Sequence, residues 1–194
     1  MNVYDFDNTI YDGESLVDFF WFCMVKKKSL SLYIPLAIYV IILYKMNLLP
    51  IDKLYKLASK MSFVVAKNRE YADSFVKEFW RENKYKLKKY YLDKITSSDV
   101  IITASPRILI EGIIDELKTK NIICSEFNLK TGKFEFICFR ENKVTAFKER
   151  YPDAVIDEFY TDSLNDLPMI KLAKNSFLVK RKERPKIINK NMYQ

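Results

Sequence analysis

Carboxylate, hydroxyl and ammonium side chains recur in four stretches of the sequence and could act together on one substrate. They are Asp5 and Asp7, Thr103, Lys143, and Asp162 with Asp166. A carboxylate can attack an electrophile or transfer a proton, whereas a lysine and a hydroxyl can hold an anionic group. Gathered at one place without a ligand, the acids would repel one another. A hard divalent cation such as Mg²⁺ would offset their charge, and a phosphate group would complete the set.

Most of these stretches follow a predicted strand. Asp5 and Asp7 come directly after the strand-forming pair VY. On its own this segment is equally well interpreted as a strand entering a turn, because Asp and Asn are common turn residues. Thr103 ends the apolar run DVIIT, and Asp162 ends VIDEFYTD. The layout of the remaining chain decides between the two interpretations.

After Ser97, short apolar strands alternate with helical patterns. The expected elements, in order, are a strand over 99–103, a helix over 107–120 opened by Pro106, a strand over 121–125, a hairpin turning at Thr131 and Gly132, a helix over about 142–151, a strand over 155–162, a helix over 164–174 and a strand over 176–180. This alternation favours a parallel sheet with crossover connections, so we predict an α/β fold with a Rossmann-like core. The carboxyl ends of its strands would meet at one edge, where ligands bind in such sheets.

The region between the first strand and Ser97 has a different pattern. Apolar and aromatic residues recur at spacings of three and four among lysines, which predicts an all-helical region. We interpret it as a cap inserted after the first strand. The expected division is a core domain of residues 1–13 and 96–180, a helical cap of residues 14–95, and a basic C-terminal tail of residues 181–194.

The composition excludes several kinds of site. The 194 residues include no histidine, which removes Ser-His-Asp and Cys-His catalysis as well as histidine-ligated metals. Only three glycines are present, and none lies in a glycine-rich phosphate loop. The three cysteines, Cys23, Cys124 and Cys138, lack CxxC spacing. We therefore expect buried thiols in a reducing, cytoplasmic setting and no catalytic thiol.

The formal net charge of +8 favours anionic partners. Basic residues concentrate in VKKKS at 25–29 and in the C-terminal KRKERPKIINK, although a solvated surface also explains both. No nucleic acid is expected, because the aromatic residues, 15% of the chain, occur in apolar runs typical of a core. A non-catalytic protein that binds a membrane or a nucleic acid is a lesser alternative, because it would not need the acidic motifs.

The four stretches, in this order, resemble the four motifs of haloacid-dehalogenase-superfamily phosphatases. The matching segments are DFDNT, VIITASP, ENKV and TDSLNDLPM. The helical insertion after the first motif is similar to the caps of the phosphoserine-phosphatase-like branch of that superfamily. The resemblance covers the whole chain except the tail. It favours a phosphatase over a dehalogenase, because the dehalogenases of the superfamily lack the second aspartate of DFD.

The resemblance implies a role for each residue in the hydrolysis of a phosphate monoester. Asp5 would be the nucleophile that forms an aspartyl phosphate. Asp7 would protonate the leaving alcohol and then activate water. Thr103 and Lys143 would hold the phosphate oxygens and offset their charge.

The same resemblance implies Mg²⁺ as the cofactor. Its ligands would be Asp5, the backbone carbonyl of Asp7, Asp162 and, through water or by orienting Lys143, Asp166. Backbone N–H groups near Asn8 and Ala104 would help to hold the phosphate. Asn8 replaces a frequent glycine of the family, and Thr103 replaces serine but keeps the hydroxyl.

Glu14 leads to one interpretation of the substrate. It lies where phosphoserine phosphatases have a glutamate that binds the substrate ammonium. A glutamate at a helix start also has an ordinary explanation, since it stabilises the helix dipole. The cap lacks the SLxxRV-type segment whose arginine binds the substrate carboxylate in those enzymes, and TAS replaces their SGG.

The first half of the cap leads to a second interpretation. SLVDFFWFCMV and LSLYIPLAIYVIILY are strongly apolar and flank a run of three lysines. The second segment, residues 30–44, is short for a span of about 20 residues, so it fits either a buried helix or an interfacial hairpin against anionic headgroups. The pattern resembles, more loosely, the phosphatidylglycerophosphatase C group. It favours a lipid or other amphiphilic phosphate as the substrate, with peripheral binding at the inner face of the membrane.

Overall fold

The computed structural model describes residues 1–26, 69–180 and 184–193, together with the separate positions Pro35, Ile38, Tyr39, Ile42, Leu43 and Met46. The helices predicted between residues 27 and 68 fall outside the described residues. The same is true of most of the apolar segment 30–44 and of the second and third lysines of VKKKS.

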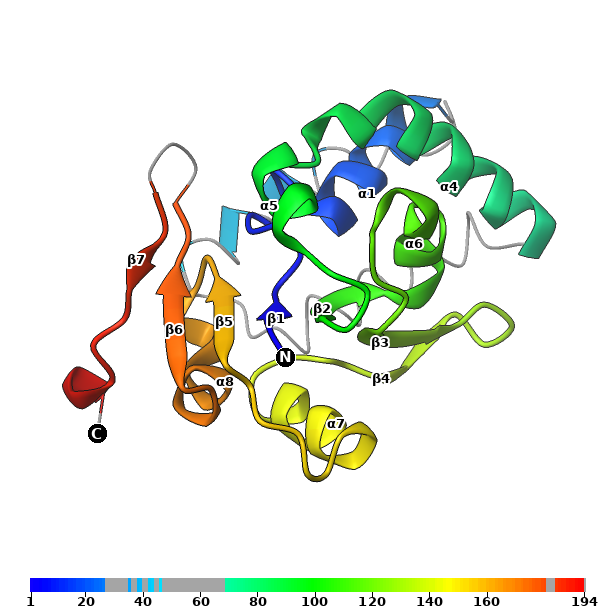
Figure 1. Cartoon of the computed structure of the whole chain (residues 1–194). Helices are drawn as coiled ribbons and strands as arrows, with labels where there is room; N and C mark the ends of the chain where they lie inside the picture. The colour runs from blue at the N-terminus through cyan, green and yellow to red at the C-terminus, as the bar shows by residue number, and fades with distance from the viewer. Residues whose placement is uncertain are drawn as a thin grey trace.

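A mostly parallel sheet of seven strands forms the centre of the protein (Figure 1). The strands are β1 (Val3–Tyr4), β2 (Val100–Pro106), β3 (Ile122–Asn128), β4 (Lys133–Phe136), β5 (Glu158–Thr161), β6 (Asn175–Leu178) and β7 (Lys186–Ile187). Their order in the sheet is β4-β3-β2-β1-β5-β6-β7. The central β1 pairs in parallel with β2 and β5, whereas β4 and β7 at the two edges are antiparallel to their neighbours. The predicted α/β fold with a parallel sheet is confirmed.

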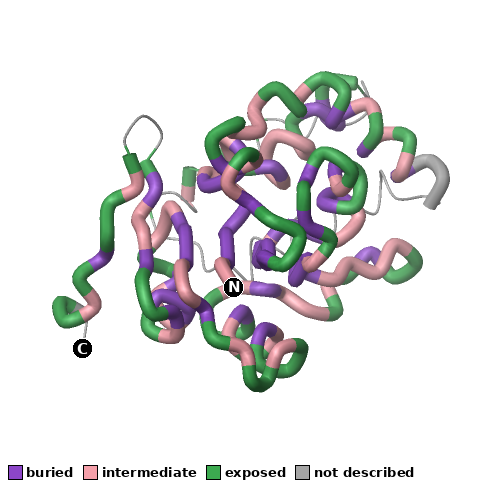
Figure 2. Tube along the Cα trace, viewed as in Figure 1, coloured by how far each residue is buried: buried purple, intermediate pink, exposed green. Residues whose placement is uncertain are grey.

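Successive residues of the inner strands pack on opposite faces of the sheet, because side chains alternate along a strand. Tyr4 and Tyr160 belong to one hydrophobic cluster, and their neighbours Val3 and Phe159 belong to another. All four side chains are buried, and Figure 2 shows buried residues concentrated along the central strands. A sheet covered on both faces explains why these strands are apolar throughout.

Helices form the two outer layers of the protein. They are α1 (Ser15–Lys26), α4 (Arg69–Asn83), η2 (Lys84–Lys86), α5 (Lys89–Lys94), α6 (Arg107–Glu111), η3 (Ile114–Glu116), α7 (Glu141–Arg150), η4 (Leu164–Asp166), α8 (Leu167–Leu172) and η5 (Lys190–Tyr193). The helices α1, α4, α5 and α6 contribute to the cluster on one face of the sheet, and α7 and α8 contribute to the cluster on the other (Figure 1).

The helices α1, α4, η2 and α5 lie between β1 and β2 in the chain. α1 and α4 pack together through Phe22 and Phe79, whose ring centroids are 5.7 Å apart. Both rings belong to the same buried cluster as Tyr4 of β1. Trp80 of α4 also donates from Nε1 to the carbonyl of Leu109 in α6 at 2.7 Å. The helices α1 and α4 therefore share one hydrophobic core with the sheet.

The continuous helix predicted over 107–120 is wrong. α6 ends at Glu111, and the chain turns at Gly112 before η3, while Pro106 is the last residue of β2. A Cβ on Gly112 would lie 2.2 Å from Cγ1 of Val76 in α4, so this position is too close to α4 for any side chain. The periodicity of the segment does not reveal this contact, because α4 is distant in the sequence.

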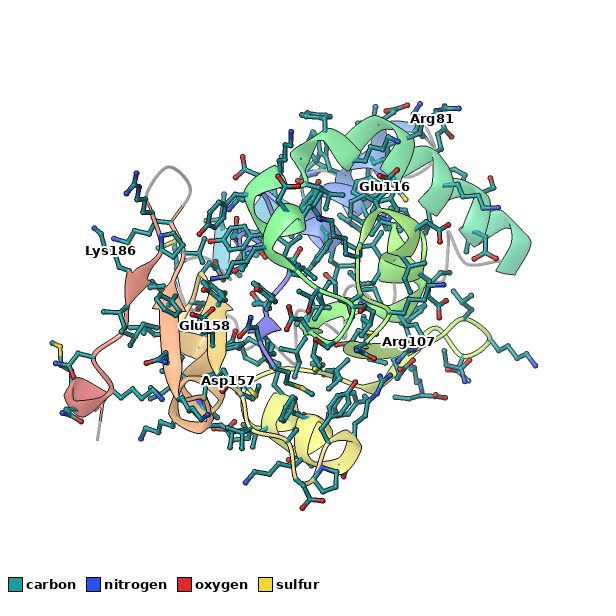
Figure 3. The ribbon with its side chains drawn as sticks, in the orientation of Figure 1. Arg81, Arg107, Glu116, Asp157, Glu158 and Lys186 are labelled. Atoms are coloured by element: carbon teal, nitrogen blue, oxygen red, sulfur yellow. The ribbon has the colours of Figure 1, made fainter. Side chains whose placement is uncertain are left out.

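The C-terminal segment that we interpreted as a tail adds a strand to the sheet. β7 pairs with β6, with Ile187 opposite Phe177, and the N–H of Ile188 donates to the carbonyl of Ser176 at 2.8 Å. Lys186 lies on the exposed edge of this strand (Figure 3). β7 is not predicted from its sequence, because a strand of two residues has no alternating pattern to detect.

The surface of α1 combines apolar and paired charged side chains. Trp21 and Val25, four residues apart on one side of the helix, are 46% and 61% exposed. Lys26, the first lysine of VKKKS, pairs with Glu78 and Glu82 of α4 at 2.8 and 2.9 Å.

In the described part of the chain, no helix has both the length and the apolar character needed to cross a membrane.

Candidate active site

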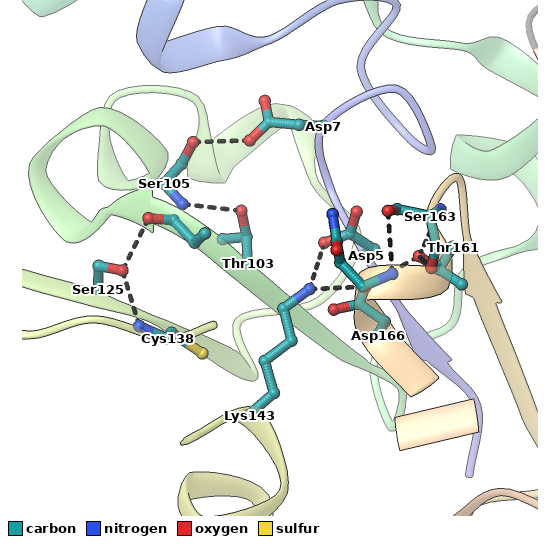
Figure 4. A network of polar contacts seen from close by, with 12 residues as sticks. Asp5, Asp7, Thr103, Ser105, Ser125, Cys138, Lys143, Thr161, Ser163 and Asp166 are labelled. Atoms are coloured by element: carbon teal, nitrogen blue, oxygen red, sulfur yellow. Dashed lines mark hydrogen bonds and ion pairs between the residues drawn. The ribbon is translucent and has the colours of Figure 1, made fainter. Parts of the chain in front are cut away.

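Lys143 joins two carboxylates at the carboxyl end of the sheet (Figure 4). Asp5 directly follows β1, and its N–H donates to the carbonyl of Tyr160 at 2.8 Å, which ties it to β5. Lys143, in the first turn of α7, donates from Nζ to Asp5 Oδ1 at 2.9 Å and to Asp166 Oδ2 at 2.8 Å. All three charged side chains are buried. Three of the predicted site residues, distant in the sequence, therefore form one ion-pair triad.

The charges of this triad are set by burial and by one another. Burial raises the pKa of Asp5 well above its usual value; Lys143 opposes this shift, and the carboxylates of Asp166 and Asp162 add to it. Burial also disfavours the charge on Lys143, but the Asp5 and Asp166 carboxylates outweigh it and raise the pKa of the ammonium. Lys143 therefore stays positively charged and offsets part of the negative charge at this edge of the sheet.

The segment after β5 carries two of the predicted acids, Asp162 and Asp166. Thr161 donates from Oγ1 to Asp166 Oδ2 at 2.8 Å, and the N–H of Ser163 donates to Thr161 Oγ1 at 3.1 Å. These bonds orient Asp166 toward Lys143. Asp162 is half-buried; burial, followed by the neighbouring carboxylates of Asp166 and Asp7, raises its pKa to about 6. Asp162 therefore lies close enough to Asp166 and Asp7 for their charges to act on its own.

Two serines hold the carboxylate of Asp7. The N–H of Ser15, the first residue of α1, donates to Asp7 Oδ1 at 2.6 Å. The hydroxyl of Ser105, in β2, donates to Asp7 Oδ2 at 2.8 Å (Figure 4). Burial raises the pKa of Asp7, and these hydrogen bonds act in the opposite direction. Each oxygen of this carboxylate is therefore oriented by a donor from a different element.

The carboxyl end of β2 supplies a hydroxyl for an anion. Thr103 is fully buried, and its Oγ1 accepts the N–H of Ser105 at 3.0 Å. A hydroxyl that accepts in this way keeps its own proton, so Thr103 can donate to a phosphate oxygen. Ser125 of β3 supports the next residue, because its Oγ donates to the carbonyl of Ala104 at 2.7 Å.

Asn8 and Glu14 lie beside the acids, in the loop between β1 and α1. Asn8 has a φ of 56°, a left-handed conformation that glycine and asparagine tolerate, which explains how it can stand where the phosphatases that the sequence resembles often have glycine. Its N–H donates to the carbonyl of Gly13 at 2.9 Å, and its Nδ2 donates to Glu14 Oε1 at 3.2 Å. Lys88 donates to the Asn8 carbonyl at 2.5 Å. Glu14 is exposed and is linked through Asn8 to the loop that carries both aspartates.

Three residues that hold the acids were not singled out in the sequence. Ser105 lies two positions after Thr103 in TASP, and a spacing of two along a strand is a signal that could have drawn attention to it. Ser15 stands at the start of a helix, where serine is ordinary. Thr161 directly precedes Asp162 and gives no separate signal. Their roles depend on contacts made only in the folded chain.

The donor set fits a hard divalent cation in its chemistry. Among the residues that the structure describes, no three acidic or thiol side chains are grouped closely enough to enclose a metal. The potential donors are all oxygens, as Mg²⁺ prefers. Burial is the main reason that the pKa values of Asp5 and Asp162 are raised, and neighbouring carboxylates add to the shift in both, a repulsion that a divalent cation at this edge would relieve. Asp5, Asp162 and the carbonyl of Asp7 are the groups that would hold the ion.

Comparisons with solved structures show the same fold in other proteins. A protein of unknown function from Bordetella pertussis Tohama I has a TM-score of 0.78 at 16% identity, covering 91% of this chain and 87% of that chain. A phosphoserine phosphohydrolase-like protein from Francisella tularensis subsp. tularensis SCHU S4 has a TM-score of 0.60 at 17% identity, covering 94% of this chain and 90% of that chain. At these identities the likeness concerns the fold.

A third structure, a HAD family hydrolase from Salmonella enterica subsp. enterica serovar Typhi, has a TM-score of 0.55 at 14% identity, covering 88% of this chain and 59% of that chain. No curated protein matches the sequence. The family model of the haloacid dehalogenase-like hydrolases matches residues 3–171, which include every acid, the lysine and the threonine of the site. The chain therefore belongs to the haloacid dehalogenase-like hydrolase family and is a hydrolase of that type.

Proposed function

We propose that this hydrolase is a magnesium-dependent phosphatase that cleaves phosphate monoesters through an aspartyl phosphate on Asp5. The observation that carries the proposal is the separation of two kinds of carboxylate. Asp5 lies against the Lys143 ammonium at 2.9 Å, whereas Asp7 is held by Ser15 and Ser105. Asp5 therefore lies beside a positive charge, which suits a carboxylate that receives a phosphoryl group, and the two donors on Asp7 suit a carboxyl group that moves a proton.

In the first step, an oxygen of Asp5 attacks phosphorus and the bond from phosphorus to the ester oxygen breaks. Asp7 gives its proton to that oxygen, so the alcohol leaves as a neutral molecule. Lys143 and the hydroxyl of Thr103 hold the oxygens of the phosphoryl group during the transfer.

In the second step, Asp7 takes a proton from water as the water oxygen attacks phosphorus. The bond between phosphorus and Asp5 breaks, inorganic phosphate leaves, and both carboxyl groups return to their starting states. Mg²⁺ held by Asp5, the carbonyl of Asp7 and Asp162 would supply positive charge to the transferred group.

An amphiphilic phosphate, such as a lipid phosphate of the phosphatidylglycerophosphate type, is the substrate class that we propose. Its support is the course of α1: the helix begins at Ser15, which contacts Asp7, and it carries the exposed Trp21 and Val25. The described positions further along, Ile38, Tyr39 and Ile42, are also exposed. Exposed apolar side chains on a helix whose first residue contacts Asp7 suit a substrate with an acyl chain, and binding at an anionic membrane surface would bring the enzyme to it.

Phosphoserine is the second candidate substrate. Its support is Glu14, which is exposed and linked through Asn8 to the loop that holds the two aspartates. A carboxylate at that position could bind the ammonium group of a small amino acid phosphate.

Phosphate release in the presence of Mg²⁺ separates these candidates. The substrates are p-nitrophenyl phosphate, phosphoserine and phosphatidylglycerophosphate in detergent micelles, with Asp5→Asn protein as the control. Preference for the micellar lipid, lost in Asp5→Asn, supports the lipid proposal. Preference for phosphoserine would assign Glu14 to the substrate. Turnover of none of the three by folded protein, with or without added Mg²⁺, would overturn the phosphatase proposal.

Two matched substitutions test the contribution of the α1 surface. Val25→Ser should lower kcat/KM for the micellar lipid and leave kcat/KM for p-nitrophenyl phosphate unchanged. Val155→Ser is the control, because Val155 is similarly exposed (55%) but lies before β5, away from the helical region. Equal effects of the two substitutions on the lipid reaction would argue against a role for α1 in substrate binding.

A further inference from the structure

Ser105 is the middle member of a chain of three side chains that ends at Asp7. Its Oγ lies 2.7 Å from the Oγ of Ser15 and donates to Asp7 Oδ2 at 2.8 Å. Both serines are buried, with 0% of Ser15 and 2% of Ser105 exposed. Water therefore does not compete for these hydroxyl groups, and their hydrogen bonds persist in one arrangement.

The direction of the hydrogen bonds in this chain follows from the number of protons. A hydroxyl group has one proton to donate, and that of Ser105 is directed at Asp7. The bond between the two serines must then be donated by Ser15 and accepted by Ser105. The chain runs from Ser15 through Ser105 to the carboxylate.

Ser15 consequently acts on both oxygens of Asp7. Its N–H donates to Oδ1 at 2.6 Å, and its hydroxyl acts on Oδ2 through Ser105. Two donors on the two oxygens fix the plane of the carboxyl group, and each oxygen keeps a second lone pair for the reacting proton. The N–H of Ser105 also donates to Thr103 Oγ1 at 3.0 Å, so one residue orients both the proton-transfer group and the phosphate-binding hydroxyl (Figure 4).

We propose that Ser105 and Ser15 are positioning residues that hold the Asp7 carboxyl in the orientation needed to protonate the leaving oxygen. This inference rests on the proposed phosphatase function. It also connects α1 to the chemistry, because Ser15 is the first residue of that helix and Ser105 belongs to the sheet. The orientation of Asp7 for proton transfer then depends on the position of Ser15 at the start of α1.

The dependence of rate on the leaving group tests the proposal. General acid catalysis contributes typically about 10²–10⁴-fold, and it matters most when the leaving oxygen is strongly basic. Ser105→Ala should therefore lower kcat/KM for phenyl phosphate by about tenfold to hundredfold, a part of that contribution. It should lower kcat/KM for p-nitrophenyl phosphate much less, because nitrophenolate departs without a proton and alanine keeps the N–H that donates to Thr103 Oγ1. A general loss of packing would reduce both rates alike.

Ser176→Ala is the matched control for this measurement. Ser176 is equally buried and its Oγ donates to the carbonyl of Ile170 at 3.0 Å, but it lies in β6 and does not contact Asp7. We expect it to leave the ratio of the two kcat/KM values as in the wild type. If Ser105→Ala lowers both substrates equally, or if Ser176→Ala changes the ratio as much, the positioning role is overturned.

The two serines should also act as one unit. Ser15→Ala keeps the N–H bond to Asp7 and should produce a smaller selective loss than Ser105→Ala. In the Ser105→Ala background it should add nothing, because its hydroxyl acts through Ser105. Additive losses would contradict the chain. If Ser105→Ala does not fold, Ser105→Cys, which keeps the volume but is a weak donor, replaces it in the same comparison.

The same two aryl phosphates distinguish a wrong positioning role for Ser105 from a wrong phosphatase mechanism. Hydrolysis of both aryl phosphates that survives Asp5→Asn would overturn the phosphatase mechanism itself. Hydrolysis that depends on Asp5 but shows no leaving-group effect of Ser105→Ala would overturn only the positioning role.

Discussion

Lys143 and Asp5 lie 138 positions apart in the sequence, and in the fold the Lys143 Nζ is 2.9 Å from Asp5 Oδ1. The Lys143 side chain is 4% exposed and that of Asp5 is 10% exposed, so this ion pair is largely removed from water. A second buried carboxylate, that of Asp166, shares the same ammonium at 2.8 Å. The charge of Lys143 therefore serves both the stability of the fold and the proposed chemistry.

Replacing Lys143 by methionine should lower stability and abolish phosphatase activity together. Removing one partner of a buried ion pair typically costs about 3–5 kcal/mol, because the other charges stay buried without compensation. We expect a loss of that size in the free energy of unfolding, measured with urea. Lys174→Met is the control, since Lys174 pairs with Asp157 at 2.8 Å on the exposed surface. Similar losses from the two variants would contradict the buried triad.

Asp7→Asn should separate the two steps of the reaction. An amide cannot take the proton from water, so the aspartyl phosphate should form from p-nitrophenyl phosphate but hydrolyse slowly. A rapid release of about one nitrophenolate per enzyme, followed by a slow phase, would show this, and mass spectrometry would detect the phosphorylated protein. The doubly substituted Asp5→Asn, Asp7→Asn protein should release none rapidly. A release independent of Asp5 would contradict the assignment of the nucleophile.

Gly112→Ala should destabilise the contact between α6 and α4. The added Cβ would lie 2.2 Å from Cγ1 of Val76 and 2.9 Å from Cδ1 of Trp80, so one of the two elements must move. Overpacking of a core costs typically about 1–3 kcal/mol, which we expect in the free energy of unfolding. In a Val76→Ala background the same substitution should cost less. Equal costs in both backgrounds would show that Val76 is not the obstacle.

Asp157→Asn should change how stability depends on acid pH. Hydrogen bonds from Lys174 and from the terminal amino group of Met1 lower the pKa of Asp157 from 3.8 to about 2. A depressed pKa gives stability that is present above the unfolded value and is lost as the pH falls through the folded value. Wild type should be the more stable protein at neutral pH, and the difference should vanish between about pH 4 and about pH 2. A difference that stays constant over that range would contradict this linkage.

The cysteines should be unreactive in the folded protein. Cys23, Cys124 and Cys138 are all buried, and burial is the main reason that the pKa of Cys124 and of Cys138 is raised to about 12. Because the thiolate is the reactive form, iodoacetamide at neutral pH should label these residues only after unfolding. Mass spectrometry before and after adding denaturant measures this. Rapid labelling of native protein, with loss of activity, would contradict the expectation that no thiol takes part.

The order of strands and helices after Ser97 could be predicted because it rests on local patterns. The alternation around Gly132 predicts a hairpin, and β3 and β4 form one. The apolar runs before Thr103 and Asp162 predict strands, which the structure has as β2 and β5. Parallel strands bring their carboxyl ends together, so the proximity of Asp5 and Asp166 follows from the predicted topology.

The interruption of the helix after Glu111 depends on a contact that the sequence does not encode locally. Gly112 lies against Val76 of α4, and the chain turns there. The pairing of β7 with β6 likewise brings together segments whose own patterns are too short to indicate a strand. In both places tertiary packing outweighs local propensity.

The residue types and their order in the chain determined which groups could do chemistry: two aspartates after the first strand, a threonine, a lysine and two further acids. Only the tertiary structure decided how those groups are held. Lys143 bridges Asp5 and Asp166, and Ser15 and Ser105 converge on Asp7 from a helix and a strand. The reason is physical, because a hydrogen bond requires donor and acceptor within about 3 Å, and folding alone brings distant residues that close.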